Sequence, residues 1–282
     1  MAAAVEANSL SESVRAAERS LDILLCFTAQ TPELSMTDIA ERVHLHKSTT
    51  HRLLATLERR RFVERHPRTG LYRLGLQVVR LVHVTLEHDE LFHTAVPYLR
   101  RLNEESEENV HLAVLDGTNV VYVHTIDGRR RVKLAAAQGQ SLPAHATASG
   151  KAILAFLPEA KVRGILRHGM RRHTPHTIHS VEAFMDDAQR ARARGYAVSE
   201  QEYESDISAL AAPVLDADSH PLASVSVAGP AYRMTKKRIR ELAPRLLSAV
   251  RELSLELRKD APARAGQSRR PAGVAGRPAR VR

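Results

Sequence analysis

The sequence predicts an α+β protein with two folded parts, and three features of the chain support this expectation. Residues 35–74 contain two short amphipathic segments with helical spacing, followed by two short strands around a basic turn. From residue 110 onward, segments rich in Val and other β-branched residues alternate with helical segments. At 282 residues, of which 43% are hydrophobic, the chain is long enough to form two hydrophobic cores.

Three helices are expected in the first part, and each has one apolar face. The first spans about residues 13–30, and its apolar face should pack behind the other two. That face consists of Val14, Ala17, Leu21, Leu24, Leu25 and Thr28. The apolar residues of the second helix are Ile39, Ala40 and Val43, and those of the third are Thr50, Leu53, Leu54 and Leu57. Cys26 is the only cysteine, so we expect a small core residue and no intrachain disulfide.

The third helix carries hydrogen-bond donors on its other face, in its N-terminal half. A helix buried on one side with donors in its N-terminal half suits the major groove of DNA. Residues 42–80 contain ten Lys and Arg against two acids, a net charge of +8, whereas a merely solvated face usually mixes signs. The segment is therefore predicted to bind DNA; the alternative is a small helical module whose cations only keep it soluble. The residues expected at the major groove are Lys47, Ser48, Thr49, His51 and Arg52, and those expected at phosphates are Arg65, His66 and Arg68.

Residues 74–86 form a segment that is apolar on almost every side. A helix with only one covered face would not need this composition. We expect a connecting helix that packs on its own domain and on a second copy of the chain. A helix buried deeply within one subunit is the alternative.

The second part should contain helices and mostly antiparallel strands. The expected strands are 110–115, 120–126, 132–136, 196–199, 207–215 and 221–228, with Asp116-Gly117 as the first turn. The expected helices are 89–107, one entered by the loop 141–151, 180–194 ending at Gly195, and a last one capped by Thr235. The inward residues of the last helix are Ile239, Leu242, Leu246, Val250, Leu253 and Leu257.

The loop 145–151, His-Ala-Thr-Ala-Ser-Gly-Lys, leads into a helix start. Free backbone N–H groups and the helix dipole make such a start a receptor for a carboxylate or phosphate. Gly150 would allow close approach of the backbone, and the Ser149 hydroxyl adds a donor. It is not a P-loop, because the preceding Gly and the Ser or Thr after the Lys are missing. An ordinary capped helix start is the alternative.

At this point several motifs in order resemble the IclR family of bacterial transcriptional regulators, over residues 13–257. They are HLHKSTTHRLLATL at 44–57, HATASGKAILA at 145–155, the Gly195-x-x-x-Ser199-x-x-Glu202 run with ALAAPV at 209–214, and ASVSVAGP at 223–230. The resemblance implies an N-terminal winged helix-turn-helix, a C-terminal GAF-like effector-binding domain, and a dimer or a dimer of dimers. It implies a DNA-binding regulator with an effector; pairing of two subunits through the 74–86 helix predicts a near-palindromic operator, and the helix start at 147–151 predicts a small organic acid as the effector.

The effector site implied by the resemblance consists of Ala148, Ser149, Gly150, Ser199, Glu202, Ala209 and Ser226. The family commonly has an acid where Ser199 stands and a Cys where Ala209 stands, so this pocket should be less acidic and slightly roomier. That favours a larger acid, aromatic ones included, over a two-carbon one. The chain also departs from the pattern at His44 and His46, where Gly and then Pro or Ser are usual, and at Asp206, where Gly is usual.

The expected domain bounds follow from these assignments. Residues 1–12 are expected to be disordered, 13–75 to bind DNA, 76–88 to connect, 89–258 to bind the effector, and 259–282 to form a disordered tail of net charge +6. No apolar run approaches the roughly 20 residues of a membrane span. No export signal is expected at the N-terminus, so we expect a cytoplasmic protein without membrane contact.

Neither an enzyme nor a metal protein is favoured by the sequence. Ser149 with His145 and Glu202 suggests a triad, but no G-x-S-x-G nucleophile elbow is present. The histidines at 168, 173, 176 and 179 lack a trustworthy ligand spacing, so they are interpreted as loop residues without a metal. No cofactor is expected. The remaining alternatives are a DNA-binding protein whose second domain only oligomerises and, less favoured, a small-molecule hydrolase.

Overall fold

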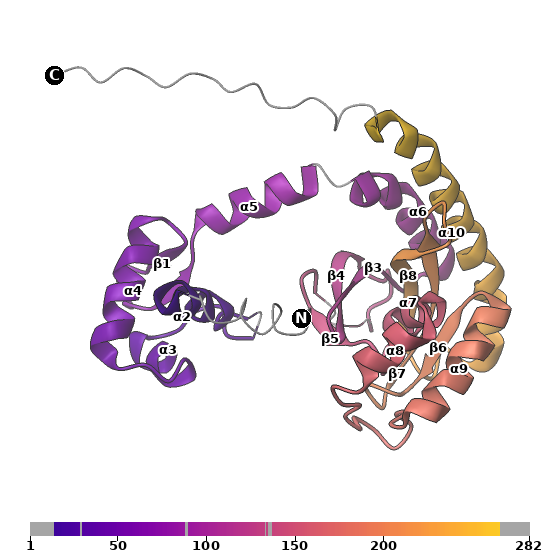
Figure 1. The fold of residues 1–282 in the computed structure, drawn as a ribbon, viewed down its shortest axis with the longest axis horizontal. Helices are drawn as coiled ribbons and strands as arrows, with labels where there is room; N and C mark the ends of the chain where they lie inside the picture. Colours follow the sequence, from indigo (N-terminus) through magenta and orange to yellow (C-terminus); the bar gives the residue numbers. More distant parts are fainter. Residues whose placement is uncertain (1–13, 29, 88–89, 133, 135–136, 266–282) are drawn as a thin grey trace, which may run out of the picture. The chain divides into compact units, whose positions relative to one another are not determined.

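The structure is a computed structural model that describes residues 14–28, 30–87, 90–132, 134 and 137–265 (Figure 1). The chain divides into two compact units, residues 1–89 and residues 90–282, and each is described by itself. Within the described ranges, no helix has both the length and the hydropathy needed to cross a membrane.

The described part of the N-terminal unit contains four helices and a two-stranded sheet. Its elements are α2 (Arg15–Leu25), α3 (Met36–Arg42), α4 (Lys47–Arg59), β1 (Val63–Arg65), β2 (Tyr72–Leu74) and α5 (Leu76–Glu87). The first five of these elements surround a core that includes Ile23, Ile39 and Leu54, all fully buried. Ser35 starts α3 with a capping box to Asp38. β1 and β2 pair antiparallel and join through a tight turn at Gly70, where φ is 73°.

The first helix differs from the expectation in length and in the face that it buries. It ends at Leu25, and Ile23 is its buried residue, whereas Leu21 and Leu25 of the predicted face are 60% and 78% exposed. The prediction of that face was wrong because α2 packs mainly against α4 with the side that carries Ile23, so Ile23 and the partly buried Leu24 fill the core. Two apolar residues of α2 therefore remain on the surface of the single chain.

The connecting helix α5 also carries apolar side chains on the surface. Five of them are about half or more exposed: Leu76, Val79, Leu81, Val82 and Val84. Exposed apolar patches of this kind are uncommon on monomeric proteins and mark interaction sites.

The C-terminal unit contains a six-stranded antiparallel sheet with the order β5-β4-β3-β8-β7-β6. The strands are β3 (Asn109–Asp116), β4 (Asn119–Ile126), β5 (Ser141–Pro143), β6 (Ala197–Glu200), β7 (Ile207–Leu215) and β8 (Pro221–Pro230). The helices are α6 (Glu90–Ser106), α7 (Ala148–Phe156), α8 (Glu159–Leu166), α9 (Val181–Arg194) and α10 (Lys236–Ala265).

Alternate residues of the strands divide between two cores, one on each face of the sheet. Leu112 and Leu210 pack against α6 and α10, and their neighbours Ala113 and Ala211 pack in the core shared with α7, α8 and α9. Helices α6 and α10 cover one face of the sheet, and α7, α8 and α9 cover the other (Figure 1). The small residues Ala113 and Ala211 lie on the face covered by α7.

Three expectations for this unit were incomplete. Val132 and Leu134 do not lie in a strand, and the edge strand is β5, which pairs Leu142 with Val120; residues 133 and 135–136 lie outside the described part. Helix α8 was not expected. Helix α10 continues past the predicted end at 258 to Ala265, because extending an existing helix costs little compared with starting one. The rest of the expected tail, and residues 1–12, lie outside the described ranges.

Candidate functional site

A cavity of about 150 Å³ lies between the start of α7 and the small-residue face of the sheet. Its lining comes from all six strands, from the start of α7 and the loop before it, from the segment after β6, and from residues 134 and 140. The lining residues are His111, Tyr122, Leu134, Gln140, Leu142, Ala146, Thr147, Ala148, Ser149, Ser199, Tyr203, Glu204, Ile207, Ala209, Ser226 and Ala228.

The first turn of α7 forms one wall of this cavity. Thr147 caps the helix: its Oγ1 accepts the N–H of Gly150 at 3.3 Å and donates to the carbonyl of Pro143 at 3.0 Å. The N–H groups of Ala148 and Ser149 belong to the first turn, where a helix offers no acceptor of its own. They are the groups that would receive an anion at a helix start.

Two buried hydroxyl groups line the cavity. They are Ser149 Oγ on α7, which lies next to the Tyr122 hydroxyl, and Ser226 Oγ on β8. The two serines are each 1% exposed, and Ser226 Oγ has no hydrogen-bond partner among the described residues. A buried polar group left without a partner costs about 1–3 kcal/mol. A ligand that bonded to Ser226 Oγ would remove this cost.

The opposite wall carries two stacked rings that are both neutral near pH 7. His111 and Tyr122 lie 4.4 Å apart between ring centroids, with an angle of 10° between planes. Burial lowers the pKa of His111 to about 4 and raises the pKa of Tyr122 to about 12. Glu204, which is exposed, is the single charged residue in the described lining. An anion in this cavity would therefore be held by dipoles and hydrogen bonds rather than by a cation.

Beneath the first turn of α7, a buried ion cluster joins three elements. Lys151 Nζ lies 2.5 Å from Glu202 Oε1 and 2.7 Å from Asp187 Oδ2, and it donates to the carbonyl of Val198 at 2.7 Å. Burial raises the pKa of Glu202 in spite of the nearby ammonium group. Glu202 was expected in the effector site, but it does not line the cavity because its carboxylate is taken up by Lys151.

Gly150 was also expected in the effector site, where it would allow close approach of the backbone. A Cβ at this position would lie 2.2 Å from the carbonyl oxygen of Ala144, so Gly150 permits contact between two backbone segments. It is absent from the cavity lining, whereas Ala148, Ser149, Ser199, Ala209 and Ser226 are all present in it. The Ser199 hydroxyl donates to the carbonyl of Ala146 at 3.1 Å.

Sequence reasoning missed the wall formed by His111, Tyr122 and Gln140. The sequence does contain a signal for His111. This residue interrupts the apolar run Val-His-Leu-Ala-Val of β3, at a position that is 1% exposed. A histidine buried within a strand needs a polar neighbour or a ligand. Here its Nδ1 lies 3.3 Å from Thr125 Oγ1.

The residues predicted to contact bases lie on α4, the third helix of the N-terminal unit, and mostly on its exposed side. On α4, Lys47, Ser48, His51 and Arg52 are exposed and Thr49 is half-buried, while Thr50, Leu54 and Leu57 face the core. The described chain gives the side chains of Lys47, His51 and Arg52 no hydrogen-bond or ionic partner. They are therefore available to another molecule.

The turn before α4 contains the two histidines that depart from the expected pattern. His44 adopts φ 50°, a left-handed conformation that side chains usually avoid. His46 caps α4, with Nδ1 lying 2.9 Å from Ser48 Oγ and accepting the Ser48 N–H at 3.4 Å. An imidazole that accepts through Nδ1 must be unprotonated there.

Of the three residues predicted to bind phosphates at β1 and the turn after it, two make hydrogen bonds within the turn. His66 Nδ1 accepts the N–H groups of Arg68 and Thr69, and Arg65 Nε donates to the carbonyl of Gly70 at 3.2 Å. These two side chains thus shape the turn itself. The Arg68 guanidinium is exposed and has no partner among the described residues.

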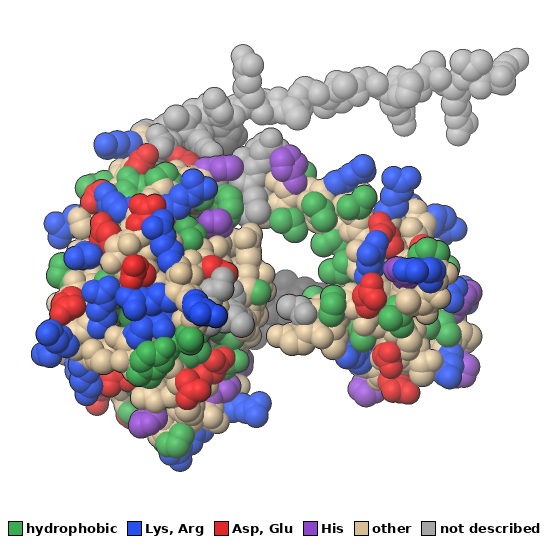
Figure 2. Space-filling view, turned by 180° about the vertical axis from the view of Figure 1, so that it is seen from behind, with side chains coloured by type: hydrophobic (Ala, Val, Ile, Leu, Met, Phe, Trp, Pro, Cys, Tyr) green, Lys and Arg blue, Asp and Glu red, His purple; other side chains and the backbone are tan. Residues whose placement is uncertain are grey.

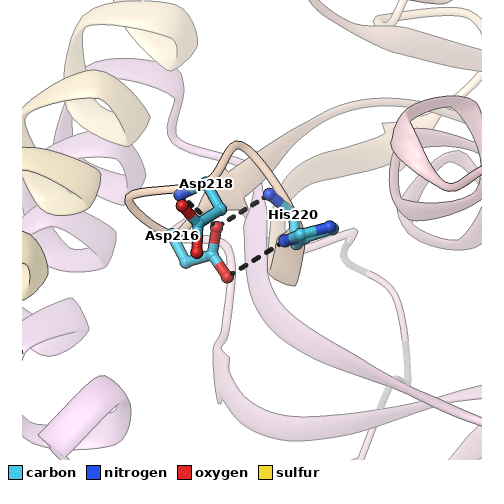
Figure 3. Close-up of side chains that lie close together, drawn as sticks. All are labelled: Asp216, Asp218 and His220. Carbon is cyan, nitrogen blue, oxygen red and sulfur yellow. Dashed lines mark hydrogen bonds and ion pairs between the residues drawn. The ribbon is translucent and has the colours of Figure 1, made fainter.

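Two clusters of possible metal ligands have structural explanations. His173 packs against the rings of His145 and Tyr203, and His168, His176 and His179 are exposed. Asp216, Asp218 and His220 lie close together in the turn between β7 and β8 (Figure 3). Asp216 Oδ1 accepts the N–H groups of Asp218 and His220 at 2.9 and 2.8 Å, so the turn accounts for this grouping.

Comparison with known proteins matches both units to one family. Residues 83–255 match the C-terminal domain of bacterial transcriptional regulators of the IclR type, and residues 16–67 match the IclR helix-turn-helix domain.

Individual relatives agree with this match. The chain is 34% identical to the HTH-type transcriptional regulator XynR of Escherichia coli over 76% of this chain and 85% of the relative. It is 31% identical to the transcriptional repressor IclR of the same organism, over 86% and 89%. Among solved structures, an IclR homolog from Microbacterium hydrocarbonoxydans complexed with 4-hydroxybenzoate is 25% identical, with a TM-score of 0.71 and coverage of 84% and 99%.

Proposed function

The chain belongs to the IclR family of bacterial transcriptional regulators, and from this premise we propose that an organic acid in the cavity at α7 controls its binding to a DNA operator. The observation that carries the proposal is that two buried hydroxyls, Ser149 and the partnerless Ser226, line one cavity together with the start of α7, whose first N–H groups are free.

The size of the cavity supports a ligand with one ring. Its volume is about 150 Å³, and an apolar cavity of about 150 Å³ in another protein holds benzene. The 4-hydroxybenzoate bound by the Microbacterium relative is of this size class. We therefore propose a one-ring carboxylic acid, with its carboxylate at the Ala148 and Ser149 N–H groups and its ring against Tyr122 and His111.

Calorimetric titration with 4-hydroxybenzoate tests this assignment. Ser226→Ala should raise the dissociation constant roughly tenfold, because a hydrogen bond to a charged or strongly polar group is lost. Ser224→Ala is the matched control, since the Ser224 hydroxyl is equally buried and partnerless but does not line the cavity. If Ser149→Ala and Ser226→Ala both bind the ligand as the wild type does, the ligand site lies elsewhere.

For DNA, we propose that the start of α4 contacts bases and that the β1–β2 turn contacts phosphates. Arg52→Ala should cost about 1–3 kcal/mol at the operator and relax its specificity. Arg68→Ala should weaken binding to all DNA sequences similarly. It should also reduce the slope of log affinity against log salt concentration by about one unit. Binding to the selected operator and to scrambled DNA at several salt concentrations separates the two effects. An Arg52→Ala variant with wild-type affinity and specificity would overturn the assignment of α4.

The exposed apolar residues of α2 and α5 support a homodimer, and a dimer of dimers is compatible with it. Leaving Leu81 and Val82 in water forgoes about 1.5–3 kcal/mol for each side chain that could be buried. A two-fold dimer would present two copies of α4 to a near-palindromic operator. Sedimentation of the wild type as a monomer at micromolar concentration would contradict this proposal.

The domain bounds and the cellular setting complete the proposal. Residues 13–75 serve DNA binding, 76–88 connect, and 89–258 bind the effector, in a protein that acts in the cytoplasm. No catalytic step is assigned to Ser149, because the possible base His145 has Nε2 at 2.9 Å from the carbonyl of Arg171 and Glu202 is paired with Lys151. Turnover of a bound acid would overturn this part of the proposal.

A further inference from the structure

A second hollow in the C-terminal unit lies between the end of α9 and the outer side of α10, and we call it the arginine groove. Its volume is about 420 Å³. Its floor is apolar, with Phe156, Pro213, Leu215, Leu247 and Val250 among the lining residues, and four arginines stand around it: Arg192, Arg194, Arg251 and Arg258. Figure 2 shows Lys and Arg side chains crowded together, with hydrophobic ones beside them, on this unit.

Charge in the arginine groove is one-sided. No carboxylate belongs to its lining in the described part of the chain. Elsewhere in the unit, arginines lie beside acids, as Arg101 does with Glu252 and Arg233 with Glu108. In contrast, Arg251 and Arg258 have no ionic partner among the described residues, and Arg258 Nε is buried without an acceptor. A buried guanidinium N–H without an acceptor is costly, so an anion is the missing component.

Strand β7, at the floor of the groove, offers few backbone groups for pairing with an added strand. β6 pairs with residues 208–211 of β7 and leaves the end of β7 without a neighbour on that side. Pro213 has no N–H to offer there, and the Leu215 N–H already donates to Ser254 Oγ at 3.1 Å. An added peptide strand is thereby disfavoured, and a small molecule with an apolar body remains the occupant that fits both the floor and the charge.

We propose that the arginine groove binds an amphiphilic organic anion, a carboxylate on an extended apolar chain. Its carboxylate lies at Arg251 and Arg258, which share one face of α10 with the half-exposed Leu255. Its chain lies on the apolar floor. Such a molecule is too large for the first cavity, which has about a third of the volume.

Helix α7 links the arginine groove to the first cavity. Ala148 and Ser149 at its start line the cavity, and Phe156 at its end lines the groove. Arg192 donates to the carbonyls of Ala155 and Leu157 at 2.6 and 3.2 Å and so caps the end of the same helix. A molecule in the groove therefore contacts the end of the helix whose start lines the first cavity.

Calorimetric titration of the full chain with decanoate tests the proposal. The wild type should show saturable binding of one decanoate per chain, and the neutral analogue decanol should bind at least about tenfold more weakly. Arg251→Gln and Arg258→Gln should each raise the dissociation constant for decanoate roughly tenfold. Arg240→Gln is the matched control, because Arg240 is exposed on α10 but does not line the groove.

Two further variants distinguish this site from the first cavity. Leu255→Asp should abolish decanoate binding by placing a carboxylate beside the chain, while Ser226→Ala should leave it unchanged. Three results would overturn the proposal. Decanoate binds the groove variants as tightly as the wild type, decanoate binding is lost in Ser226→Ala, or the wild type shows no saturable binding at millimolar concentration. None of these results depends on whether 4-hydroxybenzoate is the ligand of the first cavity.

Discussion

Replacing Lys151 with Met should be among the most destabilising single changes in the C-terminal unit. The change keeps the length of the side chain but removes an ammonium group that lies within 2.7 Å of both Glu202 and Asp187. The side chains of Lys151, Glu202 and Asp187 are only 3%, 6% and 13% exposed, so water cannot replace the lost charge. Breaking a buried pair by removing one partner costs about 3–5 kcal/mol. Asp187 retains Arg190 at 3.3 Å, which places the expected loss toward the lower end.

Urea unfolding at pH 7.5, followed by circular dichroism, measures this loss. Lys151→Met/Glu202→Gln should recover part of the stability, because the uncompensated carboxylate at 202 is gone. Arg163→Met is the control: its pair with Glu159 is solvent-exposed, at 38% and 63%, and should be worth at most about 1 kcal/mol. A Lys151→Met variant no less stable than Arg163→Met would refute the claim that a buried charge cluster holds α7 in place.

The other predictions concern pH, backbone packing and assembly. Burial lowers the folded-state pKa of His111 from 6.5 to about 4, so its stabilising contribution is present above pH 6.5 and is lost as the pH falls toward 4. Between those values the wild type should lose up to about 3 kcal/mol more than His111→Gln does in urea unfolding, and parallel curves for the two proteins would contradict the assignment. Gly150→Ala should cost at least about 1–3 kcal/mol because its Cβ would lie 2.2 Å from a carbonyl oxygen, whereas Gly164→Ala, with nothing within 4 Å, should be neutral or stabilising in the same assay. Val82→Glu should shift the sedimentation coefficient toward that of a monomer, and an unchanged dimer would argue against α5 as the interface.

Local sequence patterns predicted the elements whose buried face follows from the spacing of their apolar residues. The last helix buries Ile239, Leu242 and Leu246 as their spacing requires, and β7 has the predicted bounds 207–215. Ser180 and Gly195 delimit α9 because a hydroxyl N-cap and a left-handed Gly are strong local signals. These patterns also predicted α3 and α4, which lie within the residues that match the IclR helix-turn-helix domain.

Features set by contacts between distant segments were not predictable in this way. The buried face of α2 depends on which side of it packs against α4, and the edge strand 141–143 depends on pairing with β4. Ser149 was singled out because it begins a helix. Glu202 was placed in the site by the family resemblance, and no sequence pattern shows that Lys151, 51 residues away, occupies its carboxylate. His111 and Tyr122 were missed because their strands alternate like ordinary core strands.

The most direct test of the proposed control is the effect of one-ring carboxylic acids on operator binding. Fluorescence anisotropy with labelled operator DNA gives the dissociation constant of the wild type with and without each acid, 4-hydroxybenzoate included. We expect at least one acid to change that constant by fivefold or more, on the order of 1 kcal/mol of coupling. We also expect its half-effective concentration to rise roughly tenfold in Ser226→Ala but not in Ser224→Ala. An operator affinity that no acid in the series alters, or an effect that is identical in Ser226→Ala and the wild type, would contradict a controlling ligand in this cavity.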